Sequence, residues 1–510
     1  MLEELLLKNA QQYPLKTAIV YDKLRISYEE LYIKVRGLSK GLGAIGIRQG
    51  DCIALILPNC PEFAIAFYAT AKINAIALPL NHLFKEEEIS YYISDSKPKA
   101  IITDLKRVEL CRNIIAKIDQ NIELIIVDGI EPSTRYFYDL IVTEETKNYE
   151  NATSESGSVL YQYSSGSTGK PKRIGKTQHN LYHEVKNFAA TTNVNSTDNI
   201  LCIVPLYHAH GLGNCLLAAI SNGATLVILE QVLQQGNPVE VPFIFRRQRI
   251  LELLQSEKVT ILPAIPYIFN ILADIASDLE VGLSSLRLCF SAGNFLNKEI
   301  FDKFLTRFKI PIRQLYGCTE AGSISINLDT NMENTYDSVG IPMKNVQVKI
   351  LSDAEEELPV GKIGEVAIKS EALTSGYYNM PELNQQAFKD GWFLTGDLGK
   401  KDNNSHLYIT GRKKLLIDTG GYKVDPLEIE AILTTHPSIQ EAVVVGVKQD
   451  DIGEIIKAAI VTKEGAKIEE KEIVLFCKER MTEFKIPKII EFREEIPKSA
   501  LGKILRKDLI

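Results

Sequence analysis

Short apolar segments alternate with longer amphipathic stretches from residue 17 onward, and this alternation constrains the fold most strongly. Ser27 before Glu29 and Glu30 predicts a capped helix start, with the helix running to about residue 45. A helix is then expected at 61–74, between two apolar strand-like runs. These and the further strand-like runs are 52–57, 75–80, 100–103, 124–127, 200–204, 225–229 and 260–262. Because such alternation is typical of parallel sheets covered by helices, we expect an α/β protein with doubly wound sheets.

The pattern changes near residue 337. Strand-like pieces at 346–350 and 365–368, separated by Pro and Gly, predict a β-rich subdomain at about 337–410. Beyond 411–414 the chain predicts a compact α+β segment, with helices near 427–433 and 470–481 and strands within 442–447 and 458–462. We therefore expect a large N-terminal body at 1–412 and a small C-terminal domain at 413–510. A cleft between two such domains is a common place for a ligand.

Composition and charge exclude several protein classes. The 510 residues are 45% hydrophobic and 24% charged, which excludes a disordered or low-complexity chain. A net charge of −7 without a dense basic run argues against nucleic acid as the main partner. The eight cysteines contain no C-x-x-C pair, so we expect buried free thiols in a reducing compartment.

Neither a leader nor a membrane span is expected. The N-terminus carries acids where a signal peptide needs bases. The most apolar stretch, 63–80, is interrupted by Lys72, Asn74 and Pro79, so it predicts a core helix and a strand rather than a span. We therefore expect a cytoplasmic protein.

The stretch YSSGSTGKPK at 163–172 carries the clearest chemistry. Small hydroxylated residues and glycines leave backbone N–H groups free to hold phosphate oxygens, and Lys170 and Lys172 balance their charge. The stretch is not a Walker A loop, which needs Gly where Ser164 stands and Ser or Thr where Pro171 stands. Taken alone, it could equally be a plain Ser/Gly-rich linker.

Further motifs follow it in order along the chain. They are PLYHAHG at 205–211, LYGCTE at 315–320, WFLTGD at 392–397, GRKK at 411–414 and PKSALGK at 497–503. Together with 163–172 they resemble the ordered signature motifs of the adenylate-forming superfamily: acyl- and aryl-CoA synthetases, adenylation domains of peptide synthetases, and beetle luciferases. The resemblance spans nearly the whole chain.

The resemblance implies a reaction in two halves. A carboxylate attacks the α-phosphate of ATP, which gives an acyl-adenylate and pyrophosphate. A pantetheine thiol, on coenzyme A or on a carrier protein, then displaces AMP to give a thioester. Catalysis of such a displacement is largely positioning and charge neutralisation.

The resemblance also implies roles for individual residues. Thr319 would bond the α-phosphate, Glu320 would bind Mg²⁺, and Lys503 would bridge the substrate carboxylate and the α-phosphate. Tyr316 would stack on adenine, and Asp397 and Arg412 would contact the ribose. The residues implied at ATP or AMP are Ser164, Ser165, Gly166, Ser167, Thr168, Gly169, Lys170, Lys172, Gly293, Tyr316, Gly317, Asp397 and Arg412, with Lys503, Thr319, Glu320 and His208 catalytic.

Two further roles concern the small domain and the acid. Lys414 resembles the hinge about which the small domain rotates between the half-reactions, and Gly420, Gly421 and Tyr422 would line the pantetheine tunnel. The candidate acid pocket consists of His208, Ala209, His210, Gly211, Gly213, Phe290, Ala292, Leu315, Gly317, Ser323 and Ile324. Its small residues would leave room for a flat or elongated acid.

Each assignment has a plainer interpretation. Asp397 could be a turn former, Lys503 a solvated charge, and Tyr316 a core residue, while Cys318 is interpreted as a spacer. The remaining histidines form no zinc-ligand pattern. His210 could either bond a substrate hydroxyl or carbonyl or cap a strand end.

Some alternatives remain open at the level of sequence. Amino-acid-activating relatives usually place an aspartate where Ala209 stands, so an α-amino acid is disfavoured unless an acid comes from elsewhere. The rival functions are a stand-alone amino-acid adenylation enzyme that loads a separate carrier protein, a luciferase-like oxygenase and a non-catalytic binding protein. Glu320 and Lys503, both present, argue against the last.

Overall fold

The structure is a computed structural model. It describes residues 1–118, 121–142, 157–164, 171–235, 237–275, 283–415, 417–419, 422–449, 453–481, 483–499 and 504–510. By contacts the chain forms two compact units. The first comprises Met1–Lys349, Ala367–Leu394 and Asp402–Tyr408, and the second comprises Ile350–Val366, Thr395–Lys401 and Ile409–Ile510. The domain boundary expected between 412 and 413 remains a prediction.

A nine-stranded sheet in the first unit has the order β18-β17-β16-β15-β14-β10-β11-β1-β2. Its strands are β1 Thr17–Tyr21, β2 Leu24–Ser27, β10 Asn199–Cys202, β11 Thr225–Ile228, β14 Ile261–Ala264, β15 Leu288–Ser291, β16 Ile312–Cys318, β17 Gly322–Ile326 and β18 Ile341–Pro342. The strands from β1 to β16 in this order are parallel, while β2, β17 and β18 add antiparallel edges.

A second sheet of the first unit has seven strands in the order β7-β6-β5-β3-β4-β8-β9. They are β3 Cys52–Ile56, β4 Ile76–Pro79, β5 Ala100–Thr103, β6 Glu123–Ile126, β7 Arg135–Tyr136, β8 Ser158–Ser164 and β9 Lys172–Thr177. All neighbours are parallel except β8 and β9, which form an antiparallel pair.

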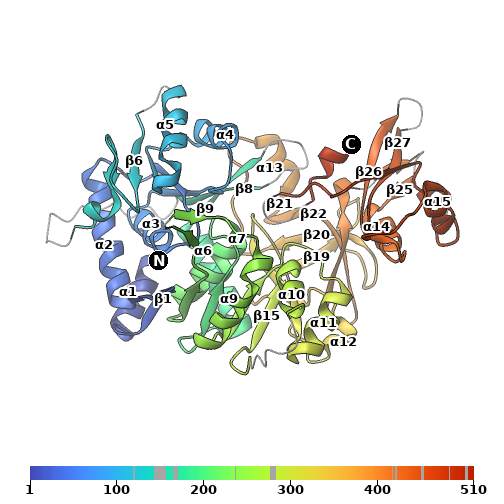
Figure 1. Ribbon diagram of the computed structural model, residues 1–510, viewed down its shortest axis with the longest axis horizontal. Helices are drawn as coiled ribbons and strands as arrows, with labels where there is room; N and C mark the ends of the chain where they lie inside the picture. The colour runs from blue at the N-terminus through green and yellow to red at the C-terminus, as the bar shows by residue number, and fades with distance from the viewer. Residues whose placement is uncertain are drawn as a thin grey trace. The chain divides into compact units, whose positions relative to one another are not determined.

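Helices cover both sheets (Figure 1). On the nine-stranded sheet, α9 Phe243–Ser256, α10 Pro266–Ala273 and α11 Lys298–Phe308 share one apolar core with β10, β14 and β15. On the seven-stranded sheet, α4 Glu86–Ser96 and α5 Val108–Lys117 pack on one face. Alternate strand residues point to opposite faces, and the other residues of β3 and β4 meet α3 Pro61–Lys72. The doubly wound α/β architecture is therefore confirmed.

Helix α2, Tyr28–Ala44, begins as the sequence predicts. The Ser27 hydroxyl accepts from the Glu30 amide at 3.2 Å and the Glu30 carboxylate accepts from the Ser27 amide at 2.8 Å. These reciprocal bonds satisfy two otherwise unpaired N–H groups of the first turn. Helix α1 spans Leu2–Gln12, and α6, which follows β9, spans Gln178–Thr192.

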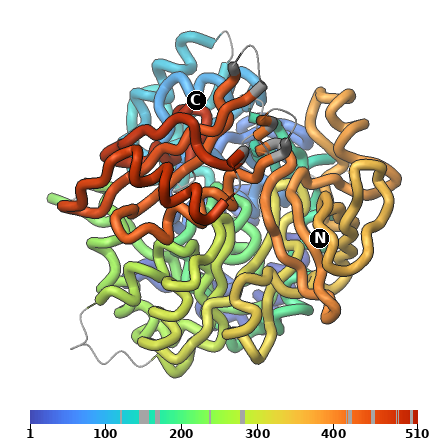
Figure 2. The backbone as a smooth tube through the Cα atoms, turned by 90° about the vertical axis from the view of Figure 1, so that its right-hand side faces the viewer, coloured from blue at the N-terminus to red at the C-terminus, as the bar shows by residue number. Residues whose placement is uncertain are grey.

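The C-terminal part of the second unit is an α+β segment, drawn in orange to red in Figure 2. Its sheet has the order β25-β24-β27-β26, with β28 pairing with β27. The strands are β24 Ile417–Thr419, β25 Tyr422–Val424, β26 Ile439–Gln449, β27 Gly453–Thr462 and β28 Ile489–Phe492. Helices α14 Pro426–Thr434 and α15 Glu470–Lys478 close one core on it. The C-terminal α+β segment is thus confirmed.

A further five-stranded sheet lies in the region where a β-rich subdomain is expected. Its order is β19-β20-β22-β21, with β23 pairing with β22. The strands are β19 Gln347–Leu351, β20 Gly364–Lys369, β21 Phe388–Lys389, β22 Trp392–Lys401 and β23 Leu407–Arg412. All eight cysteines are free thiols, and only Cys318 is not buried. Among the described residues, no helix is long and apolar enough to cross a membrane.

Candidate active site

Three of four neighbouring parallel strands of the nine-stranded sheet end beside predicted motifs. Strands β10, β14, β15 and β16 are adjacent in the sheet. The 205–211 motif follows β10, Gly293 follows β15, and Tyr316 lies near the end of β16. Since ligands of open α/β sheets bind outside the carboxyl ends of the strands, this edge is the natural place for a site.

Thr319 and Glu320 occupy the tight turn between β16 and β17. The two strands pair in antiparallel register, with Cys318 opposite Gly322. Glu320 is buried with 7% of its surface exposed, whereas Thr319 is half-buried. Gly322 has φ = 70°, a left-handed conformation that glycine adopts without strain. The hairpin therefore fixes the Glu320 carboxylate in a buried position.

The end of the predicted phosphate loop comes close to Glu320. Ser164 and Lys172 face each other at the ends of β8 and β9, and residues 165–170 between them lie outside the described residues. The Lys172 ammonium lies 4.7 Å from the centre of the Tyr377 ring, and the Tyr377 hydroxyl donates to Glu320 Oε1 at 2.8 Å. The Lys172 ammonium and the Glu320 carboxylate, which are distant in the sequence, thus both contact Tyr377.

The segment around Tyr377 is fixed to both β9 and the Glu320 turn. The Thr374 amide donates to the Glu320 carbonyl at 2.9 Å, and its hydroxyl donates to the Gly175 carbonyl at 2.6 Å. Tyr377 also forms an antiparallel bridge with Ile174. Sequence reasoning missed Thr374 and Tyr377. The sequence Thr-Ser-Gly-Tyr before Pro381 predicts a turn, but so short a pattern does not indicate a functional site unless the fold is known.

His210 belongs to a chain of polar contacts in the candidate acid pocket. Its Nε2 donates to the carbonyl of Ala264, the last residue of β14, at 3.3 Å, and its Nδ1 accepts from Asn214 at 3.0 Å. The Ser323 hydroxyl donates to Asn214 Oδ1 at 2.8 Å. Both ring nitrogens therefore have partners within the protein, and the contact of Nε2 with Ala264 caps the end of β14.

Burial keeps this imidazole neutral. Removal from water, with a smaller contribution from His208, lowers the pKa of His210 to about 4. The Phe290 ring packs against it edge-on, with 5.8 Å between ring centres. His208 itself is exposed and caps α7, Ala209–Gly211, by accepting from the His210 amide at 3.2 Å.

The glycines of the candidate acid pocket do not open free space. A Cβ at Gly211 would lie 2.1 Å from the Pro205 carbonyl oxygen, and one at Gly213 would lie 2.4 Å from Glu184 Oε1. The space before these two glycines is therefore occupied by protein, contrary to our expectation of room for the acid there. The other apolar candidates, Phe290, Ala292, Leu315 and Ile324, are all buried.

Gly293 offers an open stretch of backbone next to β15. It has φ = 86°, and a Cβ there would meet nothing within 4 Å. Tyr316 is half-buried opposite Ser325 of β17, and Gly317 is exposed. The accessible backbone after β15 and the Tyr316 ring of the neighbouring β16 could together contact a flat ring such as adenine.

The two candidate ribose contacts touch each other in the second unit. Arg412 Nε donates to Asp397 Oδ1 at 2.5 Å, and the Asp397 side chain is 7% exposed against 48% for Arg412. Glu365 supports them, because it accepts from the Gly396 amide at 3.1 Å and from Lys413 Nζ at 3.0 Å. The buried carboxylate is therefore bound and oriented by a guanidinium.

Several predicted residues cannot be placed. Gly420, Gly421 and Lys503 lie outside the described residues, as do the side chains of Lys414 and Tyr422. The chain on either side of Lys503 is held, since Lys498 and Ile504 form an antiparallel bridge. Arg506 donates to Glu430 Oε2 at 2.9 Å and to the Val444 carbonyl at 2.7 Å, which anchors the C-terminus.

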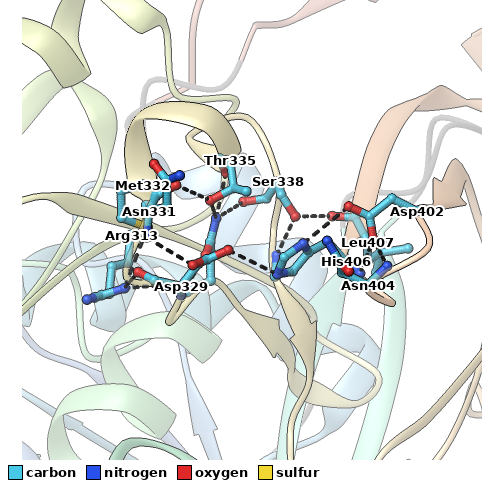
Figure 3. A network of polar contacts seen from close by, with 12 residues as sticks. Arg313, Asp329, Asn331, Met332, Thr335, Ser338, Asp402, Asn404, His406 and Leu407 are labelled. Carbon is cyan, nitrogen blue, oxygen red and sulfur yellow. Dashed lines mark hydrogen bonds and ion pairs between the residues drawn. The ribbon is translucent and has the colours of Figure 1, made fainter.

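A polar network fixes the chain that leaves β17 (Figure 3). Arg313 donates to the carbonyls of Asn327 at 3.2 Å and Asp329 at 2.9 Å. His406 lies between two carboxylates, with Asp329 at 3.5 Å from Nε2 and Asp402 at 3.2 Å from Nδ1 (Figure 3). These contacts hold β16, which carries Tyr316, and β17, which follows the Glu320 turn, against the turn before β23.

Comparison with known proteins decides the family. Residues 6–378 match the model of the AMP-binding enzyme family, and residues 428–503 match that of the AMP-binding enzyme C-terminal domain. The chain belongs to the AMP-binding enzyme family. This confirms the resemblance to adenylate-forming enzymes that the motifs carry.

Individual relatives are similar to this chain over most of their length. The chain is 31% identical to 4-coumarate–CoA ligase 4 of Arabidopsis thaliana, covering 95% of this chain and 85% of the relative. It is 30% identical to the long-chain-fatty-acid–CoA ligase of Bacillus subtilis, covering 100% and 94%. Its structure resembles that of ATP-bound MatB from Rhodopseudomonas palustris, with a TM-score of 0.87, 25% identity, and 100% and 98% coverage.

This member of the AMP-binding enzyme family is an AMP-forming acid–thiol ligase. It uses ATP to activate a carboxylic acid as an acyl-adenylate and transfers the acyl group to a thiol. The carboxylate oxygen attacks the α-phosphorus and pyrophosphate leaves. The thiol sulfur then attacks the acyl carbon, and AMP leaves with the carboxylate oxygen.

Proposed function

We propose that this ligase joins a small carboxylic acid to coenzyme A and that Mg²⁺ accompanies the ATP. Relatives named as CoA ligases support coenzyme A as the thiol. A separate carrier protein, which presents the same pantetheine arm, has no comparable support. The relatives are named for acids as different as 4-coumarate and long-chain fatty acids, so the family leaves the acid open.

The contact of Lys172 and Glu320 with Tyr377 carries this proposal. A triphosphate with its metal needs a cation for the phosphate oxygens and a carboxylate for the metal, and these two side chains supply both. We assign Lys172 and the 164–172 loop to the β- and γ-phosphates, and Thr319 to the α-phosphate. Tyr316 and Gly293 would then hold adenine, and Asp397 with Arg412 the ribose.

The residues at Glu320 fit Mg²⁺. Glu320 Oε1 is occupied by Tyr377, and the structure records no hydrogen bond to Oε2 among the described residues. The part of the chain that the structure describes contains no group of three or more His, Cys, Asp or Glu side chains that could hold a metal ion. Mg²⁺ is commonly held by one or two carboxylates together with substrate phosphates and water, so Glu320 suffices. When bound, the metal would neutralise charge on the leaving pyrophosphate.

Lys503 and the small domain complete the proposal. We assign Lys503 to the substrate carboxylate and the α-phosphate, where its ammonium would offset the charge that builds in the transition state. Lys414 would be the hinge between half-reactions, and Gly420, Gly421 and Tyr422 would line the path of the thiol.

Pyrophosphate release over a panel of acids, with Mg²⁺ and coenzyme A varied, tests the proposal. Glu320→Gln should raise the Mg²⁺ concentration for half-maximal rate about tenfold or more, because a neutral amide is a poor ligand for a hard cation. Glu333→Gln, a change at an exposed glutamate of the same unit, is the matched control. An unchanged Mg²⁺ requirement in Glu320→Gln would refute the metal assignment, and a product found only on a carrier protein would refute coenzyme A.

A further inference from the structure

A buried ion pair adjoins the candidate acid pocket. Lys176 of β9 donates to Glu184 Oε2 of α6 at 2.6 Å, and the two side chains are only 2% and 6% exposed. Replacing such a pair by apolar residues of similar volume is often neutral or stabilising. Packing alone therefore does not account for a Lys and a Glu at these positions.

The Glu184 carboxylate lies directly in front of two glycines. A Cβ on Gly213 would lie 2.4 Å from Glu184 Oε1, and one on Gly322 would lie 2.5 Å from the same oxygen. Each of these glycines would thus direct a side chain at this carboxylate. The family resemblance places Gly213 and Ser323 in the acid pocket, so Glu184 occupies space at its lining.

Glu184 Oε1 can accept a further hydrogen bond. Among the residues that the structure describes, Lys176 is the only recorded hydrogen-bond partner of the carboxylate, and it binds Oε2. The neighbouring polar groups are already used, since Ser323 donates to Asn214 and Asn214 donates to His210. A ligand donor that reached this point would therefore meet Oε1 as its acceptor.

We propose that Glu184, held by Lys176, selects acids that carry a neutral hydrogen-bond donor, such as a hydroxyl, remote from the reacting carboxylate. The inference rests on the proposed function and on the candidate acid pocket. Lys176 already balances the charge of Glu184, so a ligand ammonium would leave an uncompensated buried cation and a second carboxylate would be repelled. A purely apolar end would cover this oxygen and leave it without a partner, which sites built for a hydroxyl reject strongly.

The test compares acids that differ only at the far end. The probes are straight-chain acids of four to ten carbons ending in methyl, hydroxyl, ammonium or carboxylate, together with benzoate and 4-hydroxybenzoate. We expect kcat/KM of pyrophosphate release to favour the hydroxyl member of the preferred pair by about tenfold or more. Equal values in every pair, or a preference for a charged end, would overturn the proposal. Release with no acid at all would instead count against the proposed function.

Variants of Lys176 and Glu184 distinguish a loss of the hydroxyl preference from a loss of folding. Lys176→Met combined with Glu184→Leu removes both charges at similar volume and should reverse the preference toward the methyl member. Glu184→Gln, which keeps the shape, should reduce the hydroxyl preference about tenfold and serves if the double variant does not fold. Asp104→Asn, which breaks a comparably buried pair with Arg107, should leave the preference unchanged. An unaltered preference in both Glu184 variants would overturn the proposal.

Discussion

The proposed nucleotide contacts can be tested by changing single side chains. Asp397→Ala should weaken AMP and ATP binding about tenfold or more, because hydrogen bonds to a charged carboxylate contribute about 1.5–3 kcal/mol each. Calorimetric titration with AMP measures this. Asp353→Ala is the control, since Asp353 is 95% exposed and pairs with Lys413 in the same unit. Unchanged affinity in Asp397→Ala would return this residue to the turn-former interpretation.

His210 gives the structure a dependence on pH. Burial lowers the pKa of His210 from its ordinary value of 6.5 to about 4, so the unfolded chain binds the proton more tightly. Stability should therefore fall as pH drops from about 6.5 toward 4, by up to about 1.4 kcal/mol per pH unit. Urea unfolding at pH 7 and pH 5 should show a smaller difference for His210→Gln than for wild type. The exposed His179→Gln is the control, and an equal difference in both variants would contradict the assignment.

At the scale of elements, the segment from Thr374 to Tyr378 joins β9 to the Glu320 turn. Tyr377→Phe deletes only the hydroxyl that donates to Glu320, so kcat/KM should fall about five- to tenfold and the Mg²⁺ requirement should rise. Tyr378→Phe is the matched control, because the structure records no hydrogen bond to its hydroxyl among the described residues. An unchanged kcat/KM and Mg²⁺ requirement in Tyr377→Phe, or an equal loss in Tyr378→Phe, would contradict the role assigned to the Tyr377 hydroxyl.

A minority of the helices and strands were predicted from the sequence, and these have local signals. Periodicity and capping placed α2, α3 and the strands β3, β4 and β5 to within two residues. Tyr377 and Glu184 could not be predicted, since both act through partners that only the tertiary fold brings near. Gly213 was interpreted as open space because its spacing says nothing of the Glu184 side chain that fills it.

At the scale of the whole molecule, the two half-reactions make conflicting demands on the small domain. Lys503 and the 420–422 stretch lie about 80 residues apart, yet both are assigned to one reacting carbonyl. Lys414→Pro would fix φ near −65° at the proposed hinge. Pyrophosphate exchange should persist at a sizeable fraction of normal while thioester formation falls about tenfold or more. Normal rates of both steps would exclude Lys414 as the hinge.

Lys503 should separate the same two steps in the opposite sense. Lys503→Ala removes the cation assigned to the carboxylate and the α-phosphate, so adenylation should fall about 100-fold or more. Thioester formation from a preformed acyl-adenylate should largely survive, and Lys507→Ala, a change at an exposed lysine nearby, is the control. An equal loss of rate in both half-reactions would contradict the assignment of Lys503 to adenylation alone.

The fate of one oxygen atom tests the acyl-adenylate most directly. When the acid is supplied with ¹⁸O in its carboxylate, attack on the α-phosphorus transfers one carboxylate oxygen to AMP. We predict that mass spectrometry will find one ¹⁸O in the AMP phosphate for each thioester formed. Label in inorganic phosphate with ADP as the nucleotide product, or unlabelled AMP, would contradict the account.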